Sequence, residues 1–185
     1  SELQDARVPS RKDYLGGWLC EGDYGIIFAP RGVGKTWQSM ALAHAMSANE
    51  KFGPWAAGGD KCKVLYVDGE MPLALTKARD RGLTKSGNLH YLHHDVIFEK
   101  FAKALNLARQ EHREAIRDMV ASEGINVLFL DNFSTFVPSF GTVAQVYRWI
   151  RWLATVQRIA DRKLELAERF HAAIISARWT LPTQA

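Results

Sequence analysis

Short apolar runs alternate with amphipathic stretches along this chain. Residues 25–28, 64–68 and 126–131 are the clearest apolar runs, and we expect each of them to form a core strand. Residues 89–92 predict a weaker strand. Strands that are apolar on both faces are typical of parallel sheets, in which helices cover both sides. The pattern therefore predicts an α/β protein.

Helical periodicity falls between these strands. We expect helices over residues 36–47, 72–81 and 110–121, the last of them stopped by Gly124. Residues 49–61 contain glycine and proline and predict a loop. Strands that alternate with helices through right-handed crossovers give a three-layer α/β/α core with a mostly parallel sheet.

The length of 185 residues suits one sizeable domain. We expect a loosely held segment over residues 1–13, a core over 14–140, and a divergent part over 141–185 with a long helix and a last strand near 172–176. A truncated or divergent carboxyl-terminal part is our expectation for this last portion.

The composition says more about where the protein is located than about what it does. No apolar run approaches the ~20 residues that span a bilayer, so we expect no membrane segment. Cys20 and Cys62 lack the spacing of metal ligands, and no signal sequence is recognisable, which favours a reduced cytoplasmic setting. The net charge of +4 is compatible with a nucleotide or a nucleic acid as partner and does not choose between them.

A glycine turn follows the first apolar run, and a helical stretch follows the turn. In this order, backbone N–H groups of the turn and of the helix start converge on one point, which is an anion site. Lys35 adds a positive charge there, and the Thr36 hydroxyl can hold Mg²⁺. Ala29 stands where the strict phosphate-loop pattern has glycine, and alanine is the smallest replacement. The predicted nucleotide-binding residues are Pro30, Arg31, Gly32, Val33, Gly34, Lys35, Thr36 and Trp37.

Two acidic residues follow the other predicted core strands. Because ligands bind at the carboxyl edge of parallel sheets, Glu70 and Asp131 should lie near the phosphate loop. Asp131 is the candidate for a second Mg²⁺ ligand, and Glu70 is the candidate for orienting the attacking water, with Lys35 as the other catalytic residue. Asp68 competes for the role of base, but strand alternation favours a structural role for it.

With these residues in place, the chain resembles the RecA-like P-loop ATPases of the plasmid and phage RepA type, an AAA domain of replicative helicases. The resemblance covers about residues 16–138. It rests on four segments in the family's order, which are APRGVGKTW (29–37), VLYVDGEMP (64–72), ALNLA (104–108) and LFLDNFSTF (128–136).

The resemblance implies ATP and Mg²⁺ as ligands, single-stranded DNA as a partner, and a homo-oligomeric ring such as a hexamer. It also implies hydrolysis through the glutamate that matches Glu70. The family's carboxyl-terminal His-His or Gln-like sensor has no counterpart here, because Ala177-Arg178-Trp179 follows the last predicted strand. Two alternatives stay open. One is a nucleotide-dependent binding module or degenerate ATPase without turnover, and the other is a P-loop small-molecule kinase.

Two further features have simpler explanations. The predicted helix over 143–170 carries Arg151, Arg158 and Arg162 in one arc, which fits either a solvated face or a grip on DNA phosphates. The histidines at 90, 93 and 94 do not predict a zinc site, because His93 and His94 would point in opposite directions on an alternating segment.

Overall fold

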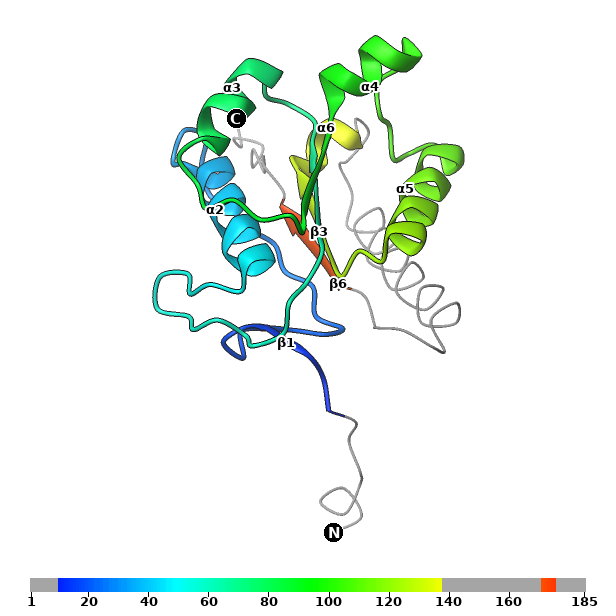
Figure 1. Ribbon diagram of the computed structural model, residues 1–185. Coiled ribbons are helices and arrows are strands. Elements are labelled where there is room, and N and C mark those ends of the chain that lie inside the picture. Colours follow the sequence, from blue (N-terminus) through cyan, green and yellow to red (C-terminus); the bar gives the residue numbers. More distant parts are fainter. Residues whose placement is uncertain (1–9, 138–170, 176–185) are drawn as a thin grey trace, which may run out of the picture.

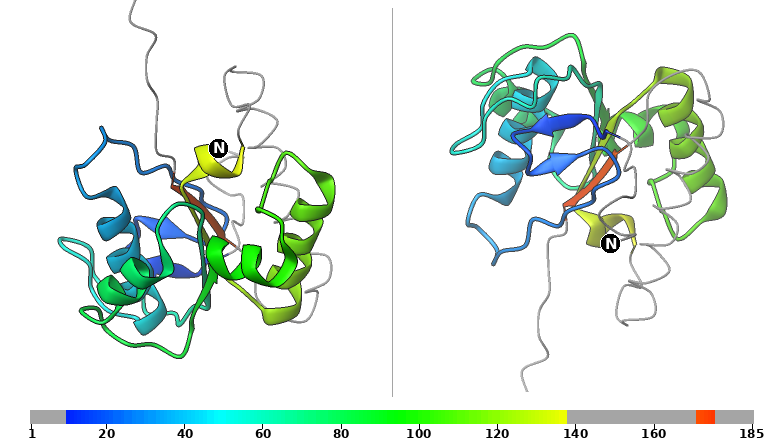
Figure 2. Two further views of the ribbon diagram at one scale, coloured as in Figure 1. Left: turned by 90° about the horizontal axis from the view of Figure 1, so that it is seen from above. Right: turned by 90° about the horizontal axis from the view of Figure 1, so that it is seen from below.

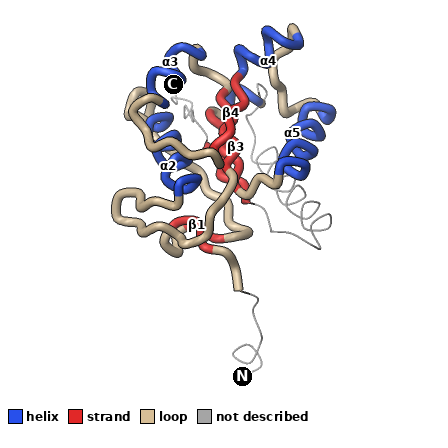
Figure 3. Tube along the Cα trace, in the orientation of Figure 1, coloured by secondary structure: helices blue, strands red, loops and turns tan. Residues whose placement is uncertain are grey.

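The computed structural model describes residues 10–137 and 171–175, which form strands and helices around one central sheet (Figure 1). In this described part the sheet has four parallel strands, in the order β4-β3-β5-β6. They are β3 (Val64–Asp68), β4 (Leu89–His93), β5 (Val127–Asp131) and β6 (His171–Ile175). Figure 3 shows β3 and β4 between helices on either side.

Helices cover both faces of the sheet. α2 (Lys35–Ala48) and α3 (Leu73–Asp80) lie on one side, and α5 (Gln110–Glu123) lies on the other, as both views of Figure 2 show. α4 (His94–Phe101) and the short α6 (Phe133–Phe136) follow the carboxyl ends of β4 and β5. A hairpin of β1 (Asp13–Leu15) and β2 (Leu19–Cys20) lies at the opposite end of the molecule (Figure 1). The predicted three-layer α/β fold class is confirmed.

The strands β3 and β5 divide their side chains between two apolar cores. Val64 and Tyr66 pack with α2, whereas Leu65 and Val67 pack with α5. In β5 the same alternation sends Phe129 to the α2 side and Leu128 to the α5 side. Both strands are buried along their whole length, which explains why they are apolar without a polar face.

Most predicted elements are confirmed with ends that differ by one or two residues. The expected strands at 64–68, 89–92 and 126–131 are β3, β4 and β5, and the expected last strand near 172–176 is β6. The expected helices are α2, α3 and α5. The helix predicted over 143–170, with its arc of arginines, lies outside the described residues.

The prediction of a core strand at residues 25–28 is wrong in the described part of the chain. Within this segment Ile26 alone forms an isolated β-bridge and no strand develops, and Ile26 and Phe28 are 54% and 59% exposed. Ile27, between them, packs against the α2-side core. β5 pairs with β3 on one side and with β6 on the other, and residues 25–28 belong to none of the four strands of the described sheet. A core strand in this fold is covered on both faces, whereas in this segment Ile27 is covered and its two neighbours are exposed.

The loop over residues 49–61 packs directly on the backbone of β1. A Cβ atom at Gly58 would overlap the carbonyl of Asp13 and the backbone of Tyr14.

We expect Gly58→Ala to lower the free energy of unfolding by about 1–3 kcal/mol, because the backbone cannot move aside as a side chain could. Urea unfolding followed by circular dichroism checks this. Gly87→Ala is the matched control, since a Cβ there would meet no atom within 4 Å, and an equal loss in both variants would contradict the explanation.

Candidate functional site

The glycine turn before α2 has the backbone of an anion cradle. Gly32 and Gly34 have φ angles of +83° and +90°, in the left-handed region that glycine adopts without strain. α2 begins directly at Lys35, and its first intrahelical bond runs from the Gln38 N–H to the Gly34 carbonyl. The N–H groups before Gln38 therefore have no partner within the helix and are available to phosphate oxygens.

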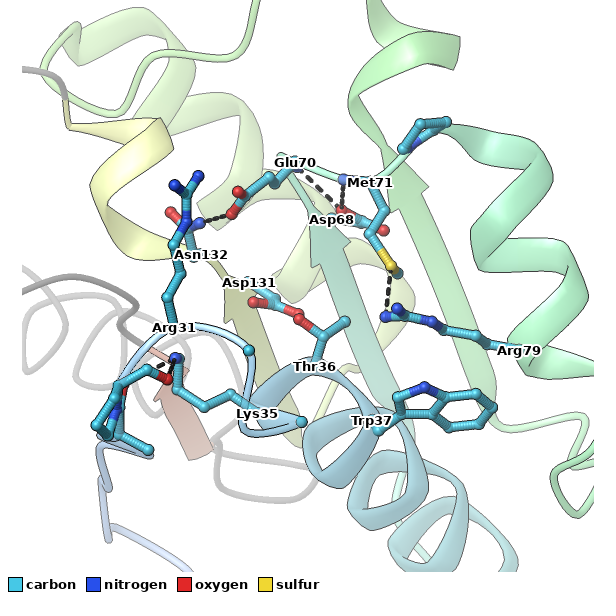
Figure 4. Close-up of a pocket in the computed structure, with 15 residues that line it drawn as sticks. Arg31, Lys35, Thr36, Trp37, Asp68, Glu70, Met71, Arg79, Asp131 and Asn132 are labelled. Atoms are coloured by element: carbon cyan, nitrogen blue, oxygen red, sulfur yellow. Dashed lines mark hydrogen bonds between the residues drawn. The ribbon is translucent and has the colours of Figure 1, made fainter.

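Lys35 lies folded across this turn. Its ammonium group donates to the carbonyl oxygens of Ala29 at 2.8 Å and Pro30 at 2.7 Å (Figure 4). These bonds hold the charge at the glycine turn, where the oxygens of a bound phosphate would compete with the two carbonyls for the same donor. The ammonium group bonds more strongly to a charged phosphate than to a neutral carbonyl, so a bound phosphate would draw Lys35 away from these carbonyls.

Asp131 lies at the floor of the same site, at the carboxyl end of β5. Its side chain is 5% exposed and accepts a 2.6 Å hydrogen bond from the Tyr66 hydroxyl. Burial raises the pKa of the Asp131 carboxyl, and hydrogen bonds from Tyr66 and Thr36 oppose that shift. The nearby carboxylates of Asp68 and Glu70 raise it further.

These oxygens fit a magnesium ion. Mg²⁺ prefers hydroxyl, carboxylate and phosphate oxygens, and the side chains of Thr36 and Asp131 lie next to each other in the pocket (Figure 4). The mutual repulsion of three neighbouring carboxylates would be relieved by a cation. Thr36 and Asp131 would hold the metal, as the sequence predicts.

The contact of Tyr66 with Asp131 yields a prediction for the metal site. We expect Tyr66→Phe to raise the Mg²⁺ concentration needed for half-maximal nucleotide binding by about 10-fold, because removal of a group that orients a metal ligand weakens metal affinity. A titration with a fluorescent nucleotide analogue at rising Mg²⁺ measures this. Tyr91→Phe is the control, since its ring also contacts Tyr66 but its hydroxyl bonds to His44; equal shifts in both variants would argue against the assigned contact.

Glu70 stands at the open rim of the site. It follows β3 by two residues, its side chain is exposed, and its Oε2 accepts a hydrogen bond from the side-chain amide of Asn132. The turn beneath it is fixed by Asp68, whose Oδ1 accepts the N–H groups of Glu70 and Met71 at 3.0 Å each. Asp68 is 1% exposed, and its other oxygen accepts from the Thr76 hydroxyl. Asp68 therefore acts as a brace for the turn, whereas the carboxylate of Glu70 is open to water.

One pocket of about 840 Å³ joins these groups, and Figure 4 shows its labelled side chains around a common space. At its far side the guanidinium of Arg79 lies 5.2 Å from the ring centre of Trp37 and donates to the Met71 sulfur. Of the residues predicted from sequence, only Val33 does not line the pocket, and its side chain is 60% exposed. The lining residues are Ala29, Pro30, Arg31, Gly32, Gly34, Lys35, Thr36, Trp37, Asp68, Glu70, Met71, Pro72, Arg79, Asp131 and Asn132.

The sequence interpretation missed Tyr66, Arg79 and Asn132. Tyr66 looks like an ordinary core aromatic in an apolar strand, and only its register opposite β5 brings its hydroxyl to Asp131. Arg79 lies with Lys77 in the last turn of α3, and nothing in the neighbouring sequence distinguishes it as a pocket residue. Asn132 follows Asp131 directly, and an amide beside a predicted metal ligand is the one signal that could have found it.

The histidines near β4 differ from the sequence expectation in one respect. The rings of His93 and His94 stack with centres 4.7 Å apart, because α4 begins at His94 and strand alternation stops there. With Asp68 they form a cluster of metal-ligating types. However, Nδ1 of His93 accepts the Asp95 N–H and caps α4, which leaves the proton of the neutral ring on Nε2, toward Asp68 and Thr76. Burial lowers the pKa of His93, in keeping with this neutral form, so the cluster braces the turn rather than offering a ready metal site.

The glycine turn, the start of α2 and the acidic residues after β3 and at the end of β5 have the arrangement of a P-loop. A family model described as AAA domain matches residues 1–166, and the chain belongs to this family of nucleotide-binding ATPase domains, which use ATP with Mg²⁺. A search of curated proteins gave no match. Among the described residues, no helix has the length and apolar character needed to cross a bilayer.

Proposed function

We propose that this chain binds ATP with Mg²⁺ in the pocket and hydrolyses it in a RepA-type replicative helicase or loader, acting on single-stranded DNA of a plasmid, phage or integrated element. The observation that carries the proposal is the convergence of Lys35, Asp131 and Glu70 on one pocket beside the glycine turn. The net charge of +4 agrees with a polyanionic partner. The likeness of four ordered segments to that family supports the role in replication and the ring assembly.

The pocket accounts for the binding of each part of the nucleotide. The turn N–H groups and Lys35 would hold the β- and γ-phosphates. The base would lie toward Trp37 and Arg79, where an aromatic ring and a guanidinium plane offer stacking surfaces. Thr36 and Asp131 would hold Mg²⁺, which neutralises charge on the phosphate oxygens.

Glu70 would carry the proton transfer of hydrolysis. Its carboxylate accepts a proton from a water molecule as the water oxygen forms a bond to the γ-phosphorus. The bond from that phosphorus to the β–γ bridging oxygen breaks at the same time, and ADP and phosphate leave. Because Glu70 is exposed, its carboxyl returns the proton to solvent.

Steady-state hydrolysis of ATP with Mg²⁺, with and without single-stranded DNA, tests this function, together with light scattering to measure assembly. Turnover raised by single-stranded DNA but not by duplex DNA supports the proposal. Tight nucleotide binding without turnover would assign a binding module instead. Transfer of phosphate to an acceptor other than water would assign a kinase.

A further inference from the structure

Asn132 lies beside two of the three acidic residues that line the pocket, Glu70 and Asp131. It follows Asp131 at the end of β5, it is 4% exposed, and it lines the pocket together with Glu70. Its backbone continues into α6, which begins at Phe133. The side chain is therefore attached to the same strand end that presents Asp131, whereas Glu70 lies in the turn that follows the neighbouring strand β3.

The hydrogen bonds of Asn132 fix which way its amide points. The Oδ1 atom accepts the Thr135 N–H at 2.9 Å, the Thr135 hydroxyl at 2.8 Å and the Ser134 hydroxyl at 2.7 Å. A flipped amide would set its N–H₂ group against the Thr135 N–H, donor against donor. The oxygen therefore caps α6, and the nitrogen must face the other way, where it donates to Oε2 of Glu70.

This bond holds one position for a side chain that makes no other side-chain hydrogen bond in the described part of the chain. Glu70 is exposed and has three rotatable bonds, so without a partner its carboxylate would sample many positions. The amide holds one oxygen and leaves the other available to water. Because the donor is neutral, it holds the carboxylate without an opposing positive charge, unlike a lysine or arginine.

We propose that Asn132 is a positioning residue that sets the carboxylate of Glu70 for its work on the attacking water. This inference rests on the proposed function, since it needs Glu70 to act as the base. Asn132 contacts Glu70 rather than the nucleotide, so its removal should affect turnover far more than binding.

Asn132→Asp is the sharpest test. Aspartate keeps an oxygen for the Thr135 N–H and so keeps the cap of α6, but it replaces the donor to Glu70 by a repelling oxygen. We expect kcat to fall about 100-fold, the usual cost of misplacing a reacting group by about 1 Å, with the affinity for a non-hydrolysable ATP analogue changed by less than about threefold. In a Glu70→Gln background, Asn132→Asp should lower the residual rate by no more than about twofold, because both changes act through one group.

Asn126→Asp is the matched control. Asn126 is equally buried, accepts the Lys63 N–H through Oδ1, and precedes β5 at the opposite end of the strand from the pocket. It should leave kcat within about twofold of the parent. A parent-like kcat in Asn132→Asp, or an equally large loss in the Glu70→Gln background, would overturn the proposal.

A spectroscopic readout separates this inference from the proposed function. The side-chain amide signals of Asn132, identified in ¹⁵N–¹H spectra by their loss in Asn132→Asp, should move when Glu70 is replaced by alanine. They should not move in Glu50→Ala, which alters an exposed acid that bonds to Thr84. If the parent chain fails to hydrolyse ATP but the signals move as expected, the enzymatic proposal falls and the contact stands. If the signals ignore Glu70→Ala, the positioning role is refuted whatever the hydrolysis assay shows.

Discussion

Replacement of Glu70 by glutamine should lower the rate of ATP hydrolysis by about 100- to 10,000-fold, the range in which general bases contribute. Glutamine has nearly the same size and keeps an oxygen that can accept the Asn132 amide, so the shape of the pocket rim should survive. It cannot take a proton from water. The affinity for ATP should therefore stay within about threefold of the parent value. Single-turnover measurement of phosphate release, beside equilibrium binding of a fluorescent ATP analogue, separates the two effects.

Glu50→Gln serves as the matched control, because Glu50 is exposed and lies just beyond α2 rather than in the pocket. If Glu70→Gln kept most of the parent rate, Asp68 would become the remaining candidate for the base. Its burial and its bonds to two backbone N–H groups and the Thr76 hydroxyl argue against that role. Asp68→Asn would then be the deciding variant.

Replacement of Lys35 by alanine should weaken binding and hydrolysis together. A hydrogen bond to a charged group contributes about 1.5–3 kcal/mol, which corresponds to about 10- to 100-fold in affinity for ATP. Hydrolysis should fall further, because negative charge develops on the phosphate oxygens in the transition state. In the parent, Lys35 donates to the carbonyls of Ala29 and Pro30, which are not buried and can bond to water after the change, so the fold should be retained.

Isothermal titration with ATP and Mg²⁺ measures this loss, and thermal unfolding without nucleotide shows whether the variant is folded. Lys51→Ala is the control, since Lys51 is exposed in the loop after α2 and does not line the pocket. Parent-like affinity in Lys35→Ala would mean that the nucleotide binds elsewhere. The assignment of the glycine turn as the phosphate cradle would then be abandoned.

The elements that could be predicted from sequence are those whose signal is local. β3 and β5 are apolar on both faces, and each ends in aspartate. α2 follows directly on a glycine turn, and this order of strand, glycines and helix is a short local pattern. α4 gave no such signal. Its cap is a histidine ring, none of its residues is buried, and Phe98 and Phe101 on it are about 60% exposed, so its apolar residues do not mark a face that packs on the core.

The candidate site divides in the same way. Lys35, Thr36 and Asp131 belong to short motifs and were accessible from sequence, as was Glu70 by its place after a strand. The partners of these residues depend on the register between strands that are far apart in the chain. Tyr66 reaches Asp131 because Asp68 lies opposite Asp131 in the ladder, and the amide of Asn132 reaches Glu70 for the same reason. No local pattern encodes that register.

The pairing of β3 with β5 determines the stage of folding at which the protein becomes able to bind nucleotide. The two strands are separated in the chain by α3, β4, α4 and α5, so the carboxylates meet only after this entire crossover has folded. Pairing over such a long loop closes late, because its entropy must be lost before its contacts form. Nucleotide affinity is thus a property of the finished core alone, and a ligand that binds only this state raises its resistance to heat by mass action.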